Sequence, residues 1–438
     1  MNKDVSIFWF RRDLRLEDNV GLFYALSENE NVLPIFIFDK NILDKLEDKY
    51  DRRVHFIHQA LEKIQLELTK IASSLLVFNS TPKEIFNKLL IEYKVKCVYV
   101  NHDYEPYAHL RDAEILELLK QHHVEFKTYK DQCIFEKKEV VKDDGTPYTV
   151  FTPYSNKWKK TLSYLHYKSY ETQKHFNHFL KQSPEELPSL SQLGFEETDI
   201  KLLPNKTVSE ELIQKYKAQR DFPAIEGTSK LSVYLRFGLI SIRGLVSKSI
   251  NLSETWLNEL IWRDFYMMIL SNFPHVAEHA FKSKYERIVW QNNETDFKKW
   301  CNGETGFPIV DAGMRELNAT GFMHNRVRMI VSSFLIKDLL IDWRWGEAYF
   351  AKKLNDFDLS ANNGGWQWAS GSGCDAAPYF RVFNPSEQQK KFDPNFIYIK
   401  KWIPEYGSIN YPTPIIDHAF ARLRVIKLYK EALTGFGN

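Results

Sequence analysis

The sequence predicts an α/β fold followed by an all-α fold in one chain: a doubly wound parallel sheet, a long linker and a mostly helical domain. Three observations predict this order. Short β-branched and aromatic runs alternate with helical periods up to about residue 130, the next stretch is irregular and polar, and helical periodicity dominates beyond Thr207. We therefore expect an α/β domain at residues 1–130, a linker at 131–205 and a helical domain at 206–438.

Five short runs near the N-terminus have the composition of buried parallel strands, because β-branched and aromatic residues dominate them. They span residues 5–10, 32–38, 75–79, 97–101 and 124–129. Helical periods occupy residues 52–72, 82–93 and 106–122, and the first of these helices would place Phe56, Ala60 and Leu68 on one face. Strands that alternate with helices in this way are typical of a doubly wound sheet.

The end of the first strand argues against an ordinary dinucleotide site. The chain reads Arg11-Arg12-Asp13-Leu14-Arg15 where a dinucleotide-binding sheet carries a G-x-G-x-x-G turn. Those glycines let backbone amides approach a pyrophosphate closely. We therefore expect that this sheet does not hold a dinucleotide in the usual way.

The linker and the helical domain differ in their patterns. Turn formers at residues 143–147 and a polar stretch at residues 183–188 indicate a long linker with some helix. Beyond it, Leu257, Leu260, Ile261 and Phe265 recur with helical spacing, and no internal repeat is present. These patterns favour one continuous helical domain.

The overall composition excludes several classes of protein. Lys plus Arg number 59 and Asp plus Glu 57, so any contact with DNA has to come from a local basic surface. Four cysteines without a C-x-x-C pair argue against a zinc site and a disulfide framework, and they fit a reducing cytoplasm. No signal peptide or membrane-length apolar window is recognisable, so we expect neither export nor a membrane span, and no metal site.

Nine of the eleven tryptophans lie between Trp256 and Trp402, and two helical motifs hold some of them. Residues 256–266 place Glu259, Trp262, Arg263 and Tyr266 on one helix face, and residues 323–329 contain a second i, i+4 pair, of an asparagine and a methionine. Each motif alone is also compatible with an ordinary salt-bridged or capped surface helix.

A third motif is less ordinary. The stretch from Asn355 ends in Asn362-Asn363-Gly364-Gly365-Trp366-Gln367-Trp368, and its turn formers, amides and indoles are too dense for an ordinary helix. We therefore expect a functional segment here rather than a regular structural helix.

With these motifs in order, the chain resembles the photolyase and cryptochrome family. The likeness runs from Phe8-Trp9-Phe10-Arg11-Arg12-Asp13-Leu14-Arg15-Leu16 to about Tyr429, and the motifs look like those of class I cyclobutane pyrimidine dimer photolyases. The resemblance implies light-driven repair of pyrimidine dimers in DNA by electron transfer from reduced, anionic FAD to a flipped-out dimer. It implies DNA carrying such dimers as the partner of a monomeric protein.

The resemblance also implies where FAD is held. Asn362 would lie beside the flavin N5 atom, and Arg328 paired with Asp356 would offset the negative charge of reduced flavin. Hydroxyls and a lysine in Thr228-Ser229-Lys230-Leu231-Ser232 would hold the pyrophosphate, although that run alone favours a simple helix cap. The remaining residues implied to line FAD are Tyr216, Trp256, Glu259, Arg263, Phe357 and Asp358.

By the same resemblance, Trp262 and Trp368 would clamp the flipped dimer. Glu259 and Asn325 would hydrogen-bond its pyrimidine edges, and Met329 would pack against it. Arg326 and Gln388 match positions near the DNA backbone. Three further basic residues, which are by default a solvated face, could extend this rim: Arg381, Lys390 and Lys391.

Trp366, Trp343 and Trp290 match the chain of indoles that carries an electron from the protein surface to oxidised flavin. Aromatic residues in a helical domain are usually core, and spacing alone does not show a relay. The three other tryptophans of this region we interpret as packing: Trp300, Trp345 and Trp402.

Three alternatives remain beside dimer repair. A photolyase for (6-4) lesions uses histidines about its lesion, where this chain has Asn325 and Met329, and His324 lies off that pattern. A light-sensing cryptochrome usually departs at the pocket tryptophans or adds a long tail. A DNA-binding flavoprotein without repair activity would lose the pocket, whereas Glu259, Trp262, Asn325 and Trp368 are all present here.

The second, light-harvesting chromophore of this family is the least determined feature. Folate-binding relatives tend to carry Asn and Glu about where Tyr107 and Ala108 lie in this chain. We therefore expect a deazaflavin or an empty cleft rather than a folate.

Overall fold

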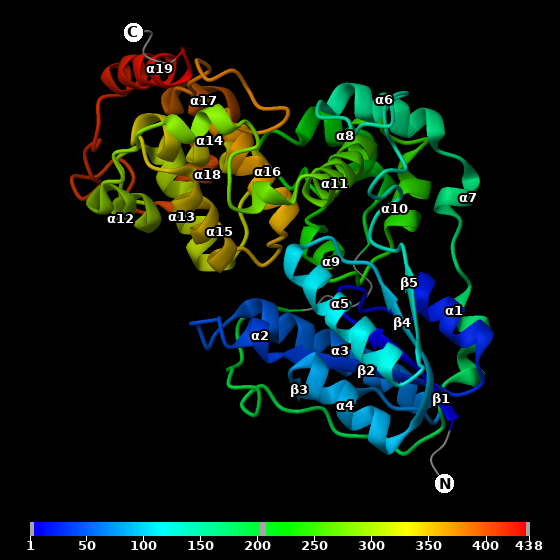
Figure 1. Ribbon diagram of the computed structural model, residues 1–438. Coiled ribbons are helices and arrows are strands. Elements are labelled where there is room, and N and C mark those ends of the chain that lie inside the picture. The colour runs from blue at the N-terminus through cyan, green and yellow to red at the C-terminus, as the bar shows by residue number, and fades with distance from the viewer. Residues whose placement is uncertain (1–3, 202–206, 435–438) are drawn as a thin grey trace. The chain divides into compact units, whose positions relative to one another are not determined.

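The computed structural model describes residues 4–201 and 207–434 (Figure 1). Its internal contacts divide the chain into two compact units that are discontinuous in sequence. The α/β unit comprises Met1–Glu136, Leu162–Thr207 and Leu231–Ile250, and the helical unit comprises Lys137–Thr161, Val208–Lys230 and Asn251–Asn438. The domain boundaries expected near residues 130 and 205 stay a prediction.

The α/β unit is built on one parallel sheet with the strand order β3-β2-β1-β4-β5. The strands are β1 (Asp4–Phe10), β2 (Val32–Asp39), β3 (Leu76–Ser80), β4 (Lys94–Asn101) and β5 (Glu125–Tyr129). Each lies where a strand was expected. The order reverses between β1 and β4, which is the topological switch point of a doubly wound sheet.

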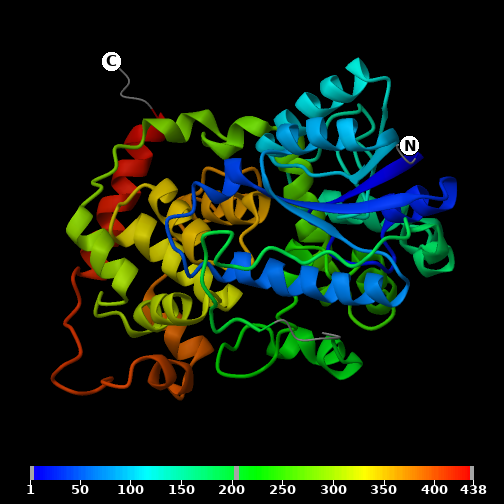
Figure 2. The same cartoon turned by 90° about the horizontal axis from the view of Figure 1, so that it is seen from below.

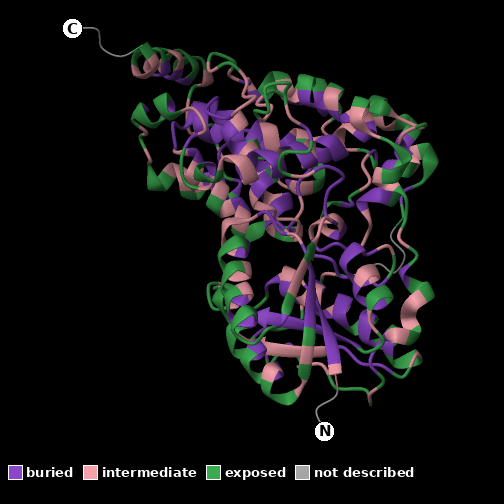
Figure 3. Ribbon diagram, turned by 45° about the vertical axis from the view of Figure 1, so that its right-hand side comes forward, coloured by how far each residue is buried: buried purple, intermediate pink, exposed green. Residues whose placement is uncertain are grey.

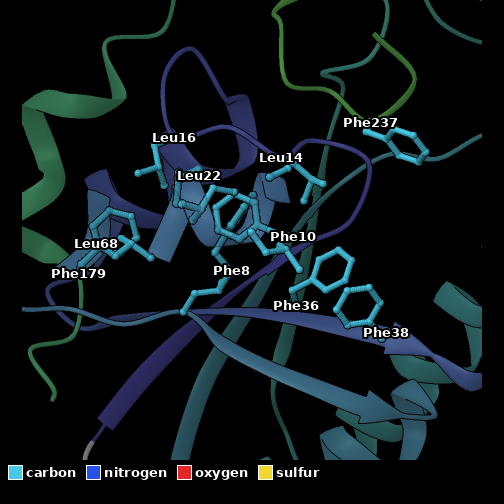
Figure 4. Packing of buried hydrophobic residues seen from close by; sticks show 14 of the residues in the cluster. Phe8, Phe10, Leu14, Leu16, Leu22, Phe36, Phe38, Leu68, Phe179 and Phe237 are labelled. Carbon is cyan, nitrogen blue, oxygen red and sulfur yellow. The ribbon is translucent and has the colours of Figure 1, made fainter. Parts of the chain in front are cut away.

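Helices cover both faces of this sheet because its strands are apolar on both sides. Phe8, Phe10, Phe36 and Phe38 point to one face, where they pack with residues of α1 (Val20–Glu28) and α3 (Arg52–Lys70), as Figure 4 shows in part. The intervening strand residues point to the other face, where α4 (Pro82–Glu92) and α5 (Pro106–Gln121) pack. Figure 2 shows α3 on one side of the sheet and α4 and α5 on the other. The expected doubly wound fold is confirmed.

Shorter elements complete the α/β unit. They are α2 (Lys40–Leu43), α7 (Tyr164–Tyr167), a 3-10 segment (Thr172–His178), α9 (Ser232–Arg236) and α10 (Ile242–Ser249). Phe179 pairs with Val32 in an isolated parallel bridge, which ties part of the expected linker to the end of the sheet.

The helical unit contains no strand in its described residues. Its α-helices are α6 (Phe151–Thr161), α8 (Glu210–Gln219), α11 (Glu254–Asn272), α12 (Glu294–Asn302), α13 (Pro308–Thr320), α14 (Asn325–Ser333), α15 (Trp343–Lys353), α16 (Leu359–Ser370), α17 (Pro385–Phe392), α18 (Ile397–Trp402) and α19 (His418–Thr434). Figure 3 shows buried ribbon through the middle of this unit, with exposed ribbon on its outer helices. Across residues 4–201 and 207–434, no helix is long and apolar enough to cross a membrane.

One expectation is wrong: the turn-rich stretch that ends at Trp368 does form a regular helix, α16. Asp358 caps its start by accepting from the backbone N–H groups of Ser360 and Ala361 at 3.1 and 3.3 Å. Gly371, with φ +89°, ends it in the left-handed conformation. Gly364 inside the helix makes room for a neighbouring ring, because an added Cβ would lie 2.2 Å from Tyr266 Cδ1. The glycine therefore serves close packing rather than a turn.

Candidate active site

Helix α16 is the element on which the candidate site is assembled. It packs against α11, α14 and α15, and Figure 1 shows α14, α15 and α16 close together. These helices carry most of the site residues that the sequence indicates: Glu259 and Trp262 on α11, Arg328 and Met329 on α14, and Asn362 on α16. The fold therefore brings the three motifs together although they are far apart in the chain.

Arg328 and Asp356 form the expected ion pair. Arg328 Nη2 lies 3.0 Å from Asp356 Oδ2, and Arg328 Nε donates to the backbone oxygen of Met323 at 2.8 Å. These contacts fix the guanidinium, whose side chain retains 26 % of its exposure. A fixed and partly accessible cation can neutralise an anionic ligand group.

Asn362 is held by a carboxyl that the sequence did not single out. Its Nδ2 donates to Glu347 Oε1 at 2.7 Å and to the backbone oxygen of Glu347 at 3.2 Å. Burial raises the pKa of Glu347, and the hydrogen bond from Asn362 lowers it by less. Both contacts use the amide nitrogen of Asn362, so its side-chain oxygen can still accept a hydrogen bond from a ligand.

Glu259 is half-buried on α11, beside Arg220. Burial raises its pKa, although Arg220 forms a close ion pair with it and acts in the opposite direction. The Glu259 side chain nevertheless retains 35 % of its exposure. A carboxyl that is surrounded by protein and still accessible is typical of the wall of a ligand cavity. Tyr216, on α8, is half-buried beside Arg220, and burial raises its pKa too.

The two pocket tryptophans are half-buried and differ in their neighbours. Trp262 lies flat against Phe151, with ring centroids 3.7 Å apart and an interplanar angle of 3°. Trp368 contacts Phe383 at 6.4 Å and lines a small cavity together with Tyr266. On α14, Met329 is half-buried and Asn325, the first residue of the helix, is exposed.

Arg326 is the best-supported cation of the expected DNA rim. It forms an ion pair with Asp221 at 2.7 Å and lies 4.3 Å above the ring of Phe392 on α17. Gln388 lies one helical turn before Phe392 and therefore on the same side of α17.

The other rim cations are exposed, and their contacts differ. Lys390 pairs with Glu387 at 2.7 Å, whereas Lys391 lies over Phe392 and Arg381 over Phe383, at 5.2 and 5.5 Å. The ion pair partly offsets the charge of Lys390, as the contact with Asp221 does for Arg326.

The expected phosphate-binding run lies just before α9. Thr228 and Ser229 are half-buried, Leu231 is buried and Ser232 is the exposed first residue of the helix. Lys230 adopts a positive φ of 51°, pairs with Glu226 at 2.6 Å and lies 5.6 Å over the Phe322 ring. The hydroxyls suit a phosphate, whereas the lysine already has a carboxylate partner.

Four further residues expected near FAD come from one helix and one connecting segment. Trp256 is buried and Arg263 half-buried, both on α11. Phe357 and Asp358 are half-buried in the segment that leads into α16, where Asp358 acts as the helix cap.

The three expected relay tryptophans lie in one region of the helical core. Trp366 and Trp343 are buried in the same hydrophobic cluster, and Trp290 packs at its edge and contacts Tyr429 at 6.2 Å. Trp366 packs tightly on α15, because a Cβ on Gly346 would lie 2.1 Å from its ring.

The tryptophans interpreted as packing lie in that cluster too. Trp300 is fully buried, contacts Trp366 at 6.1 Å and donates to the backbone oxygen of Val331, and Trp345 and Trp402 pack at the edge. Burial therefore does not by itself separate relay residues from packing residues.

Sequence reasoning missed the partners of the site residues: Arg220, Asp221, Glu347 and Phe151. Arg220 follows Tyr216 by one helical turn, and Glu347 follows Trp343 by one turn, so helical spacing could have indicated those two. Phe151 lies in the expected linker, and nothing in the sequence around it points to α11.

Comparison with known proteins agrees with this fold. The family described as "DNA photolyase" matches residues 6–175, and "FAD binding domain of DNA photolyase" matches residues 256–410. A deoxyribodipyrimidine photo-lyase of Synechococcus is 36 % identical and aligns over 97 % of this chain and 96 % of its own length.

Two solved structures share the architecture over the whole chain. A class III photolyase from Agrobacterium tumefaciens has a TM-score of 0.86 at 30 % identity and covers 99 % of this chain and 98 % of its own. A photolyase from Sulfolobus tokodaii, crystallised with two FAD molecules, has a TM-score of 0.83 at 36 % identity and covers 98 % and 99 %. The fold and the site thus define a protein of the photolyase class. More particularly, the chain belongs to the DNA photolyase family.

Proposed function

We propose that this protein is a deoxyribodipyrimidine photolyase of class I, a carbon–carbon lyase that repairs cyclobutane pyrimidine dimers in DNA with light. The observation that carries the proposal is the packing of α11, with Glu259 and Trp262, and of α14, with Met329, against α16, which carries Trp368. Two indoles, a carboxyl and an apolar thioether suit a damaged pyrimidine pair, which offers two flat faces and polar edges.

The residues of the helical unit fit FAD. The fixed Arg328–Asp356 pair, the Asn362 amide and the accessible Glu259 carboxyl are the donor and acceptor types that an isoalloxazine ring and an adenosine require. When bound and reduced, FAD supplies the light absorption and the electron that open the cyclobutane ring, and the electron returns afterwards.

The residues expected at FAD divide into those for the flavin and those for the remainder. In the proposed assignment Arg328 offsets the negative charge of the reduced ring, and Asn362 turns its side-chain oxygen to N5 while Glu347 holds its nitrogen. Thr228, Ser229 and Ser232 bind the pyrophosphate, with Lys230 and Leu231 shaping the run. The remaining walls are Tyr216, Trp256, Glu259, Arg263, Phe357 and Asp358.

The dimer lies between Trp262 and Trp368 in this proposal. Extrusion from the duplex is the general solution of enzymes that act on a base, and a dimer that pairs poorly lowers its cost. Glu259 offers its carboxyl to one pyrimidine edge, and burial raises the pKa of this carboxyl against the effect of Arg220. Asn325 offers both a donor and an acceptor to the other pyrimidine edge.

Affinity for the DNA backbone comes from the rim around this pocket. Arg326 and Gln388 contact phosphates, and Arg381, Lys390 and Lys391 add weaker attraction that carries no sequence preference. We further propose that the protein acts as a monomer in the cytoplasm with access to chromosomal DNA. All four cysteines are free thiols in the structure, which fits a reducing compartment.

Trp366, Trp343 and Trp290 form the proposed electron path to oxidised flavin. The match of these three indoles to the relay of the family supports this role, and Trp366 and Trp343 share one hydrophobic cluster against which Trp290 packs. For the second chromophore we propose a deazaflavin or none. The Tyr107 hydroxyl donates to Asp39 at the end of β2, so this side chain projects from α5 over the carboxyl edge of the sheet.

The decisive experiment uses the reduced protein and two damaged oligonucleotides. One carries a cyclobutane dimer and the other a (6-4) lesion, and each is incubated in light and in darkness. We expect only the dimer to be restored, and only in light. Restoration of the (6-4) lesion would assign the chain to the alternative enzyme, and restoration of neither would favour a sensor or a binding protein.

A further inference from the structure

The first helix after the α/β sheet, α6, lies along α11 in a fixed antiparallel register. Lys159 Nζ donates to Glu254 Oε1 at 2.6 Å, and Ser155 Oγ donates to Asn258 Oδ1 at 3.2 Å. Each step of one turn toward the start of α6 thus corresponds to one turn toward the end of α11. The next turn places Phe151, the first residue of α6, against Trp262.

A buried contact anchors this register. Trp158 is fully buried, and its Nε1 donates to Asp264 Oδ2 at 3.0 Å. A buried indole N–H that finds a charged acceptor fixes the two helices relative to each other, because losing the contact would leave polar groups unpaired.

The start of α6 is held from a second side. The backbone N–H of Phe151 donates to Asp375 Oδ2 at 3.0 Å. Asp375 lies in the loop that follows α16, seven residues after Trp368, and both residues line the same small cavity. Phe151 is therefore positioned by the helix that carries Trp262 and by the loop that follows Trp368.

The contact between the two rings is a full face-to-face overlap. The centroids lie 3.7 Å apart and the rings are parallel to within 3°, whereas Phe265 and Tyr266 meet Trp262 at 83° and 31°. Phe151 thus covers one face of the indole. The indole stays half-buried, so part of it remains accessible to a ligand.

We propose that Phe151 is a positioning residue for lesion binding, which holds the ring plane of Trp262 so that the opposite face can stack on the flipped dimer. The inference rests on the proposed role of Trp262. A ring that is already fixed loses little freedom when a base stacks on it, so the support of Phe151 appears as affinity for the lesion. Phe151 itself does not touch the dimer.

The test measures dark binding of a dimer-bearing oligonucleotide to flavin-loaded Phe151→Leu protein. We expect its Kd to rise about threefold to tenfold, the equivalent of one lost aromatic pair. Phe151→Tyr keeps the ring and should bind like the parent. Repair at saturating oligonucleotide and photoreduction of the flavin should stay unchanged, because Phe151 acts only on binding.

A matched control separates this role from a general loss of packing. Phe307→Leu removes a buried ring from the same unit, where Phe307 contacts Phe334 at 4.7 Å, and it should lower stability without changing lesion affinity. If Phe151→Leu fails to retain flavin, Asp375→Ala tests the same geometry with both rings present, and it should weaken lesion binding in the same direction.

A double-mutant cycle gives the sharpest outcome. In a Trp262→Ala background, Phe151→Leu should have no further effect on lesion affinity, because its effect passes through the indole. Additive losses, or a Phe151→Leu variant that binds like the parent while Trp262→Ala binds weakly, would overturn the inference and leave the proposed function intact. Unchanged affinity in Trp262→Ala would instead remove the role of Trp262 on which the inference rests.

Discussion

The two units of the molecule treat buried charge in opposite ways. In the α/β unit, Asp131 is 1 % exposed and accepts from Arg15 and Arg243 at 2.6 and 2.9 Å. Burial alone would raise its pKa, but the two guanidinium groups lower it to about 2. In the helical unit, Glu259 and Glu347 keep raised pKa values, because burial outweighs the few groups that stabilise their charge.

The difference indicates which unit has carboxyls whose charge the protein stabilises only in part, so that they can still interact with a ligand. Asp103 behaves like Asp131: burial would raise its pKa, but Arg12 and Arg111 lower it. Asp13 shows the converse within the same unit: it accepts from Asn101 and a backbone N–H rather than from a guanidinium, and burial raises its pKa. Two or more arginines thus stabilise the charges of Asp131 and Asp103 in the α/β unit, whereas Glu259 has one arginine partner, Arg220, and Glu347 has the Asn362 amide.

The largest expected effect on stability comes from breaking the buried ion pairs of Asp131 with Arg15 and Arg243. Asp131→Asn removes the carboxylate partner of the buried Arg15 and leaves Arg243 with Asp18 alone, and breaking a buried pair in this way costs about 3 to 5 kcal/mol. We expect a correspondingly lower free energy of unfolding in urea, with unchanged dimer affinity in the protein that remains folded. A loss below about 1 kcal/mol, the range of exposed pairs, would mean that these ion pairs stabilise the fold no more than pairs on the surface do.

Substitution of the pocket tryptophans should change dimer affinity, whereas Asp131→Asn should change stability. Trp262→Ala and Trp368→Ala are each expected to weaken dimer binding by about 1 to 3 kcal/mol, the range for a lost base stack. Titration of labelled oligonucleotide measures this, and Trp402→Ala is the control, since Trp402 packs at the edge of the core. Equal affinity in both pocket variants and the parent would refute the assignment.

The acid limb of stability should belong to the α/β unit. The pKa of Asp131 is about 2 in the folded protein and near 4 in the unfolded chain, so its stabilisation is present above pH 4 and is lost as the pH falls toward 2. The expected loss is about 2 kcal/mol. Urea titrations across this range should show a steeper fall in the parent than in Asp131→Asn, and parallel curves would contradict the pairing.

Replacing the carboxyl of Glu347 by an amide should stabilise the fold, whereas the same replacement at Asp131 should destabilise it. Glu347 has a raised folded pKa, so its ionisation destabilises the fold as the pH rises above the ordinary carboxyl range. Glu347→Gln keeps an acceptor for Asn362 and removes that charge. We expect a small gain in stability near neutral pH and a flatter pH profile, and a loss as large as that of Asp131→Asn would erase the contrast between the units.

One substitution should slow photoreduction of the flavin without changing dimer repair. Trp366→Phe is expected to slow photoreduction of the purified oxidised protein and to leave dimer repair by chemically reduced protein unchanged, because Trp366 is proposed to feed the flavin and not to hold the lesion. Flash spectroscopy of parent and variant measures the first, and a repair assay the second. Equal photoreduction rates would remove Trp366 from the path.

How far the sequence predicts this molecule depends on the range of the interactions. The five strands and the helices α3, α4 and α5 follow from local periodicity, so their positions were predictable within a few residues, whereas α1 and α2 were not predicted. The motifs identify residues such as Trp262 and Asn362 because these recur in a known order. Helix α16 was not predicted, since Gly364 and Gly365 have low helix propensity and tertiary packing against Tyr266 overrides it.

The partners of the site residues depend on the folded chain. Arg220 meets Glu259, and Asp375 meets Phe151 across more than two hundred residues. No local pattern encodes such pairs, because each exists only after the helices have packed. Phe151 is the clearest case. It lies in a stretch predicted as linker, yet its ring covers one face of Trp262, a residue of the proposed pocket.

One measurement tests the central claim most directly, namely that the helical site both binds and repairs the dimer. Reduced parent protein, Asp131→Asn and the double variant Trp262→Ala, Trp368→Ala are illuminated with the same dimer-bearing oligonucleotide, at a temperature where all three are folded. We expect restoration by the parent and by Asp131→Asn, and none by the double variant at oligonucleotide concentrations near the parent Kd. Equal restoration by the double variant would contradict the account.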